Sequence, residues 1–256
     1  MISAQFFALI FIVLFIALTI VYSYKIQRDS LSPELRPIPG FDSIKLQLAE
    51  AIEQGRQIHI SLGIGSLFNQ SATDTLAGLL VVDYVSDQTN AAGLRAVVTT
   101  SDPTVSIMAQ ERLYQPSLSH ARVGVSSTLS FHEAQWISTN PTAYAAGVMG
   151  LLGSETFESN FMIGRFDDTY LMMAEFAQQQ HATSTTLSGS SDPNILPYVF
   201  ATSPQGIWGE DIFAAGAYLM NKPSHIASLL AQDTFRWVIG SIILLGVILR
   251  TLGLVA

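Results

Sequence analysis

The chain contains no cysteine among its 256 residues, which rules out a thiol nucleophile and leaves the redox compartment undefined. Charged residues are scarce, at 12%, and 20 acidic residues outnumber 12 Lys and Arg. The net charge of −8 provides no basic surface for nucleic acid and disfavours peripheral adsorption to anionic lipid. We therefore expect no nucleic-acid partner, and any membrane attachment must come from apolar segments.

Several catalytic motifs are missing as well. The sequence lacks G-x-x-x-x-G-K-[ST], H-E-x-x-H and G-x-S-x-G, the motifs of Walker-type nucleotide sites, zinc proteases and serine hydrolases. Its five histidines are scattered and form no i, i+4 pair: His59, His120, His132, His181 and His225. We expect no metal centre, no cofactor and no hydrolase chemistry.

Long apolar runs, by contrast, lie near both ends. The run 6–22 is apolar except for Thr19, and as a helix it nearly crosses a bilayer core of about 30 Å. A cleaved signal peptide is the alternative, but the basic n-region and the A-x-A site are missing. We expect residues 1–24 to be a transmembrane anchor, followed by a proline-rich linker over 25–40.

The second run extends over 237–249 and is interrupted only by Ser241 before Arg250. A buried amphipathic helix is the alternative, but a run without a polar face favours lipid on all sides. Residues 224–256 are therefore expected to form a connecting helix that continues into a second transmembrane helix. Basic residues are concentrated next to the inner ends of both runs, which predicts a cytoplasmic middle domain and outward-facing termini.

The middle segment, 41–223, alternates extended apolar runs with amphipathic runs, which is typical of βαβ units on a mostly parallel sheet. Four extended runs are followed by Asp or Asn and then by Pro or Asp, residues that begin helices: Asp102-Pro103, Asn140-Pro141, Asp167-Asp168 and Asp192-Pro193. Thr73 or Asp74 would begin the helix after the first strand. These five junctions predict an α/β, Rossmann-like three-layer domain. The segment 122–131 is read as an extra edge strand or hairpin, and the small-residue-rich segment after Pro204 is expected to form one helix that stops at Pro223.

A partial G-x-G follows the first predicted strand, in Gly63-Ile64-Gly65-Ser66. The third glycine of a dinucleotide-binding loop is missing, so these glycines are interpreted mainly as a turn. Because carboxyl ends of parallel strands meet at one edge, this turn and the capping residues are the best candidate ligand site. The candidate residues are Gly63, Gly65, Ser66, Asp102, Asn140, Asp167 and Asp192; the alternative is that each only shapes a turn or caps a helix.

Six short strings occur together in order: HISLG, DTLAGLL, TTSDPT, PTAYAAG, NFMIGRF and AQDTFRW. Over about 41–237 the chain resembles a family of bacterial membrane-anchored proteins known only as a domain of unknown function. Ser101 stands where that family leads us to expect glycine. The resemblance implies no assigned activity and supplies no catalytic residues.

Two functions are consistent with these observations. The first is a non-enzymatic integral membrane protein of the bacterial cytoplasmic membrane, acting as a structural or scaffolding subunit of a homo-oligomer or larger membrane complex. The small residues of PTAYAAG and DIFAAGAY would then either pack helices on the sheet or form a subunit interface. The second is a membrane-anchored small-ligand sensor or degenerate enzyme that binds at the carboxyl edge of the sheet.

Overall fold

The computed structural model describes residues 4–28, 33–122, 133–180 and 185–251. These residues fall into two compact units. One spans Pro37–Met220, and the other combines the two ends of the chain, Met1–Arg36 and Asn221–Ala256. We describe each unit by itself.

The first unit is built on a six-stranded sheet with the order β3-β2-β1-β4-β5-β6. Every neighbouring pair is parallel. The strands are β1 (Gln57–Gly63), β2 (Ala96–Thr100), β3 (Glu133–Trp136), β4 (Phe157–Arg165), β5 (Thr185–Ser190) and β6 (Ile207–Trp208). This is the strand order of doubly wound dinucleotide-binding folds, and the predicted α/β fold with a parallel sheet is confirmed.

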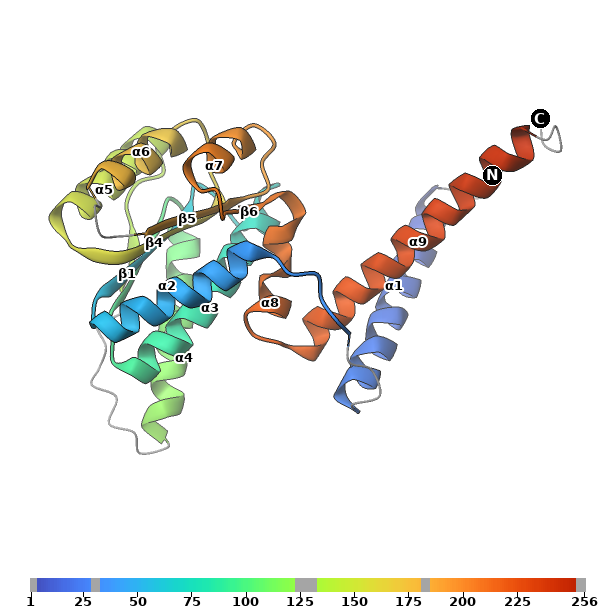
Figure 1. Cartoon of the computed structure of the whole chain (residues 1–256), viewed down its shortest axis with the longest axis horizontal. Coiled ribbons are helices and arrows are strands. Elements are labelled where there is room, and N and C mark those ends of the chain that lie inside the picture. The colour runs from blue at the N-terminus through green and yellow to red at the C-terminus, as the bar shows by residue number, and fades with distance from the viewer. Residues whose placement is uncertain (1–3, 29–32, 123–132, 181–184, 252–256) are drawn as a thin grey trace. The chain divides into compact units, whose positions relative to one another are not determined.

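Helices cover both faces of the sheet, as Figure 1 shows. On one face lie α2 (Pro39–Gln54), α3 (Ala72–Ala92) and α4 (Pro103–Arg122). The shorter helices η1 (Gly209–Ala214) and α8 (Ala215–Tyr218) lie on the same side and contact α3. On the other face lie α5 (Pro141–Ser154), α6 (Tyr170–Gln180) and α7 (Leu196–Thr202). Because helices cover both sides of the sheet, the central strands β1 and β4 are buried along almost their whole length.

Local signals account for most helix boundaries. Helix α2 ends at Gly55, whose φ of 67° is the left-handed conformation that glycine adopts without a Cβ clash. Helix α5 begins after Asn140, whose side chain accepts a hydrogen bond from the Ala143 amide at 3.1 Å. Helix α4 begins after Asp102 in the same manner, with a bond from the Thr104 amide of 2.7 Å. These capping predictions agree with the structure.

Three local predictions differ from the structure. Helix α3 begins at Ala72, so neither Thr73 nor Asp74 caps it, and Asp74 turns into the protein instead. Helix α7 begins only at Leu196, because Asp192 forms a turn with Asn194 before the helix starts.

The third difference lies after Pro204, where one helix was expected. The chain first adds the short strand β6 and then forms η1 and α8. Of the predicted edge segment 122–131, Arg122 ends α4 and the rest lies outside the described residues.

Some of the small residues in the segments PTAYAAG and DIFAAGAY allow close packing within the α/β domain. A Cβ at Gly147 of α5 would overlap the side chain of Ile137, so this glycine permits close approach within the domain. Ala214, Ala215 and Gly216 are buried in the same unit. Ala143 and Ala146 remain exposed.

The second unit contains the helices α1 (Ala4–Gln27) and α9 (Pro223–Thr251). Both are long and apolar enough to cross a membrane. They contact each other through Phe235, whose ring lies 4.7 Å from that of Phe11, and through a 3.0 Å hydrogen bond between the hydroxyls of Tyr22 and Thr234. The connecting segment and the second apolar run thus form one continuous helix.

Candidate functional site

The strand order identifies one point of the sheet as the place to look for a ligand. Strands β1 and β4 are neighbours, but the chain leaves β1 toward α3 on one face and leaves β4 toward α6 on the other. Open α/β sheets bind ligands outside the carboxyl ends of the strands at such a switch point. Here those carboxyl ends are Gly63 and Arg165, and they are register partners.

The turn after β1 is closed by the protein's own atoms. Gly63 has a φ of 72°, and a Cβ there would overlap the carbonyl oxygen of Arg165. A Cβ at Gly65 would overlap the hydroxyl of Thr75. The Ile64 amide donates a 2.7 Å hydrogen bond to the Arg165 carbonyl. In this structure the glycines therefore allow close approach of the β4 backbone and of α3, in agreement with their interpretation as a turn.

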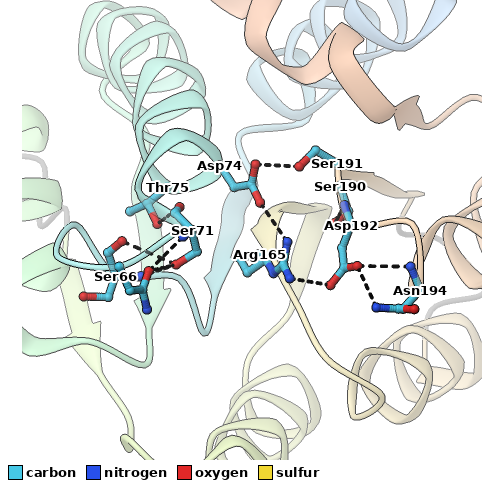
Figure 2. Close-up of polar contacts among 10 residues, drawn as sticks. Ser66, Ser71, Asp74, Thr75, Arg165, Ser190, Ser191, Asp192 and Asn194 are labelled. Atoms are coloured by element: carbon cyan, nitrogen blue, oxygen red, sulfur yellow. Dashed lines mark hydrogen bonds and ion pairs between the residues drawn. The ribbon is translucent and has the colours of Figure 1, made fainter. Parts of the chain in front are cut away.

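Ser66 lies in the loop that continues from this turn to α3. Its amide donates to the Ser71 hydroxyl at 2.9 Å (Figure 2). The Ser71 amide in turn donates to the Asn69 side-chain oxygen. The Ser66 hydroxyl is also hydrogen-bonded to the Asp102 carboxylate. The structure thus brings together two of the predicted site residues, Ser66 and Asp102.

Asp102 carries the one resolved pKa shift among the predicted site residues. Partial burial raises the pKa of this carboxyl, but hydrogen bonds from the Thr104 and Ser66 hydroxyls and from two backbone amides act more strongly together. The net effect is a pKa below the ordinary value. Asp102 is therefore an ionised helix cap at neutral pH.

The centre of the site is an ion-pair network around Arg165, which Figure 2 shows between two carboxylates. Its guanidinium lies 2.9 Å from Asp192 Oδ2 and 3.5 Å from Asp74 Oδ2. The Ser191 hydroxyl donates to the other Asp74 oxygen at 2.6 Å, and the Asn194 amide donates to Asp192 at 3.0 Å. We call Asp74, Arg165 and Asp192 the Arg165 triad.

The two acids of the Arg165 triad are almost completely buried, with 3% of Asp74 and 5% of Asp192 exposed, whereas 36% of the Arg165 side chain is exposed. Burying a carboxylate is costly unless an opposite charge and hydrogen bonds compensate for the water it loses. Arg165 supplies the charge to both. The triad therefore connects the end of β4 to α3 and to the loop after β5.

The remaining predicted residues serve their own helices. Asn140 caps α5, and Asp167 accepts a 3.1 Å hydrogen bond from the Thr169 amide just before α6 begins. Asp192 is the predicted residue that enters the Arg165 triad. Sequence reasoning missed Arg165 and the pairing role of Asp74. The available signal was a basic residue directly after the apolar run 161–164, at the end of a strand whose other residues are buried, where an unpaired charge is costly.

A polar network also lies inside the sheet beneath this edge. His59 Nδ1 is 2.7 Å from the Asn160 amide oxygen, which only accepts, and His59 Nε2 is 3.0 Å from the Thr99 hydroxyl. The Tyr144 hydroxyl of α5 lies 2.7 Å from that of Ser61. Burial raises the pKa of Tyr144, although hydrogen bonds act in the opposite direction. All these side chains are fully buried, so the network joins three strands and one helix.

The chemistry of these groups does not point to a metal. Within 4–28, 33–122, 133–180 and 185–251, no three His, Asp or Glu side chains are grouped so that they could hold a metal ion. The two acids of the Arg165 triad already share a guanidinium. What the edge can do chemically is to hold its own loops together, and to present the exposed part of Arg165.

Comparisons with known proteins were made by structure and by family. A solved structure of a conserved protein from Methanococcus maripaludis S2, described as LOR/SDH, aligns with 77% of this chain and 74% of its own. The identity is 8% and the TM-score is 0.38, so we derive no function from it. None of the curated proteins matches the chain. A family match extends over residues 1–256, and the chain belongs to the family described as Domain of unknown function (DUF6754).

Proposed function

We propose that this chain is a non-enzymatic membrane protein whose α/β domain is a structural subunit of a homo-oligomer or a larger membrane complex. The observation that carries the proposal is the Arg165 triad. It occupies the carboxyl edge between β1 and β4, and the adjoining turn is filled by Arg165 and Thr75. A domain whose ligand edge is used for internal contacts is better suited to a structural role than to turnover.

The terminal helices support the membrane part of the proposal. Both α1 and α9 have the length and composition of membrane spans, and most of their large apolar side chains are exposed. The basic residues nearest the α/β domain in the sequence favour a cytoplasmic domain and a location in a bacterial cytoplasmic membrane. An anchor at each end of the domain would restrict its orientation, which favours lateral assembly.

An aromatic surface next to β6 is the best candidate for subunit contact. The exposed rings of Phe200 in α7 and Trp208 in β6 lie 5.0 Å apart, and Tyr198 is exposed on the same helix. Aromatic residues are enriched in the energetically important part of protein interfaces. β6 is also an edge strand of the sheet.

Gentle detergent extraction of the full chain followed by mass photometry tests this proposal. We expect a discrete oligomer or complex, and we expect the double variant Phe200→Ser/Trp208→Ser to lower its mass to that of a monomer. Phe68→Ser is the matched control, because Phe68 is exposed in the loop before α3. A monodisperse wild-type monomer without partners would refute the structural-subunit proposal.

A second candidate function is binding of a small anionic ligand at the same edge. The observation in its favour is the exposed third of the Arg165 side chain, next to the polar loop of Ser66. Thermal-shift screening against nucleotides, dinucleotides and divalent cations distinguishes the two proposals, because a ligand that binds only the folded state raises its apparent stability. Absence of any shift would eliminate the ligand proposal and leave the structural one in place.

A further inference from the structure

Contacts between α1 and α9 show which part of α9 lies beside the apolar run of α1, 6–22. The Phe235 ring of α9 lies 4.7 Å from the Phe11 ring. The hydroxyl of Thr234, the preceding residue, lies 3.0 Å from the Tyr22 hydroxyl. Phe11 and Tyr22 both belong to the apolar run. This part of α9 would therefore share the depth of that run in a bilayer.

Two charged side chains, Asp233 and Arg236, flank this contact in the sequence. With a rise of about 1.5 Å per residue, both lie within about 3 Å of Phe235 along the helix axis. They would therefore lie at the depth of the apolar run of α1 and not beyond its end. Charged residues at such a depth almost always face other helices or a water-filled cavity instead of lipid.

The two side chains form an ion pair that α1 does not cover. Arg236 Nη1 lies 3.5 Å from Asp233 Oδ1, and 57% of the Arg236 side chain and 61% of the Asp233 side chain are exposed. Lipid tails neither donate nor accept hydrogen bonds. Insertion of α1 and α9 into a bilayer would thus leave this ion pair in contact with hydrocarbon unless another polar surface covered it.

The ion pair belongs to one stripe of exposed residues on α9. Gln232, Asp233, Arg236 and Gly240 are spaced i, i+1, i+4 and i+8, so they lie along one side of the helix. A Cβ at Gly240 would meet no atom within 4 Å, and a glycine in a membrane helix lets another backbone approach closely. We call these four residues the α9 stripe. It combines hydrogen-bonding groups with a site of close approach, as expected of a contact between membrane helices.

We propose that the α9 stripe is the contact with a second copy of this chain in the membrane, in which Asp233 of each copy pairs with Arg236 of the other. The stripe carries one acid and one base, so it is complementary to itself. A twofold contact between two such stripes forms both intermolecular pairs at once. A guanidinium has five N–H donors and a carboxylate has two acceptor oxygens, so each group can keep its contact within the helix while it binds the other copy. This inference rests on the proposed homo-oligomeric membrane protein and names a contact surface for it.

Charge reversal tests the proposal in the full chain, expressed with two different affinity tags and extracted with a mild detergent. Wild-type chains with the two tags should co-purify. Asp233→Arg alone, or Arg236→Asp alone, gives both copies like charges at the stripe, and each should lower co-purification by about 10-fold. Glu53→Arg is the control, because it reverses an exposed acid on α2, and it should leave co-purification at the wild-type level.

Co-expression of the two reversed chains separates contact between copies from the pair within one helix. The chain with Asp233→Arg carries two bases at the stripe, and the chain with Arg236→Asp carries two acids. Neither chain has the ion pair within its own helix, but a mixed dimer has both pairs between copies. We expect the mixed dimer to form at the wild-type level although neither chain dimerises alone, a result that also shows that both variants fold.

Because the chain has no native cysteine, cross-linking in native membranes can locate the contact. Gly240→Cys and Gly246→Cys place a thiol at two exposed glycines of α9, and a Cβ meets no atom within 4 Å at either position. At 3.6 residues per turn, Gly246 points about 120° away from the α9 stripe. We expect oxidation by copper phenanthroline to form a disulfide-linked dimer of Gly240→Cys and none of Gly246→Cys.

Three results would overturn the inference: a mixed dimer no more abundant than the dimer of either reversed chain, equal cross-linking at the two glycines, or a complex that holds one copy of this chain with another protein. If wild type is oligomeric and charge reversal has no effect, only the α9 contact fails and the proposed structural subunit stands. A monomeric wild-type chain refutes both. Release of wild type by alkaline carbonate refutes the membrane insertion on which the contact depends.

Discussion

At the scale of single residues, Arg165 is the side chain on which the carboxyl edge depends most. It neutralises two carboxylates that are 3% and 5% exposed, from two segments on either side of β4. The attraction between buried charges mainly offsets the cost of removing them from water. Loss of Arg165 would leave both acids buried without that charge.

We predict that Arg165→Met lowers the free energy of unfolding of the detergent-solubilised chain by about 3–5 kcal/mol, measured by denaturant titration. Arg112→Met is the control, because its partner Asp83 is 21% exposed, more than either acid of the Arg165 triad, and the pair should contribute at most about 1 kcal/mol. Adding Asp74→Asn and Asp192→Asn to Arg165→Met should restore part of the loss, since no buried charge then remains. If Arg165→Met costs no more than Arg112→Met, the assignment of the triad as a structural connection is wrong.

Because Asp102 is an ionised helix cap, we expect it to make the stability of the folded protein depend on pH. Its folded-state pKa is below the ordinary value, so its contribution to stability is present above the unfolded-state pKa and is lost as the pH falls through the folded-state pKa. Asp102→Asn keeps a capping side chain without the charge. We predict that wild type exceeds Asp102→Asn in melting temperature at pH 7 and that this advantage declines progressively as the pH falls below about 4.

The reciprocal variant is Asn140→Asp, which introduces a carboxylate at the equivalent cap of α5. It should raise the melting temperature at pH 7 and have no effect at low pH, because an ionised acid at a helix N-terminus is stabilised by the helix dipole. An Asp102→Asn difference that is constant across the titration would contradict the ionised cap.

At the scale of elements, the two edge strands of the sheet, β3 and β6, differ in what protects them from pairing with another strand. At the β3 edge, the Ala134 amide donates to the Gln110 side chain of α4 at 2.8 Å, and the Ser106 hydroxyl donates to the Ala134 carbonyl at 3.3 Å. These side chains occupy backbone groups that another strand would otherwise bind. At the β6 edge the strand has only two residues and lies beside an aromatic surface. Contacts through side chains, rather than strand addition, are therefore expected at β6.

The turn between β1 and α3 can be tested with two glycines of similar conformation. Gly55 and Gly63 have φ values of 67° and 72°, but a Cβ at Gly55 meets no atom within 4 Å, whereas one at Gly63 overlaps the Arg165 carbonyl. Gly55→Ala should cost about 1–2 kcal/mol of unfolding free energy from backbone strain alone. Gly63→Ala should cost about 1–3 kcal/mol more, because the β4 backbone must move. Equal losses of unfolding free energy in the two variants would show that the close approach of Gly63 to β4 does not contribute to stability.

At the scale of the whole molecule, the absence of native cysteine makes topology directly measurable. Single cysteines can be introduced at two exposed sites, Asp87→Cys on α3 and Thr251→Cys at the end of α9. With a membrane-impermeant maleimide added to intact cells, we predict labelling of Thr251→Cys only. Asp87→Cys should react only after the membrane is permeabilised, because the positive-inside bias predicts a cytoplasmic domain. The opposite pattern would overturn the cytoplasmic assignment.

Much of the architecture could be predicted because its signals are local. Apolar runs identified the two terminal helices, alternation of runs indicated a parallel sheet, and Asp102 and Asn140 marked helix starts that the structure confirms. Helix caps and glycine stops act within one turn of the chain, so a single sequence contains them. β6 was missed because a two-residue strand has no periodicity to detect.

By itself, the sequence determined the α/β class, two apolar terminal helices and a set of polar residues at the ends of strands. Only the tertiary structure decided that β1 lies beside β4, and so that Arg165 meets Asp74 and Asp192 at that edge. The physical reason is that strand order depends on contacts between residues far apart in the chain, which local preferences do not specify. The same contacts turned Asp74 from a predicted helix cap into a buried partner of Arg165.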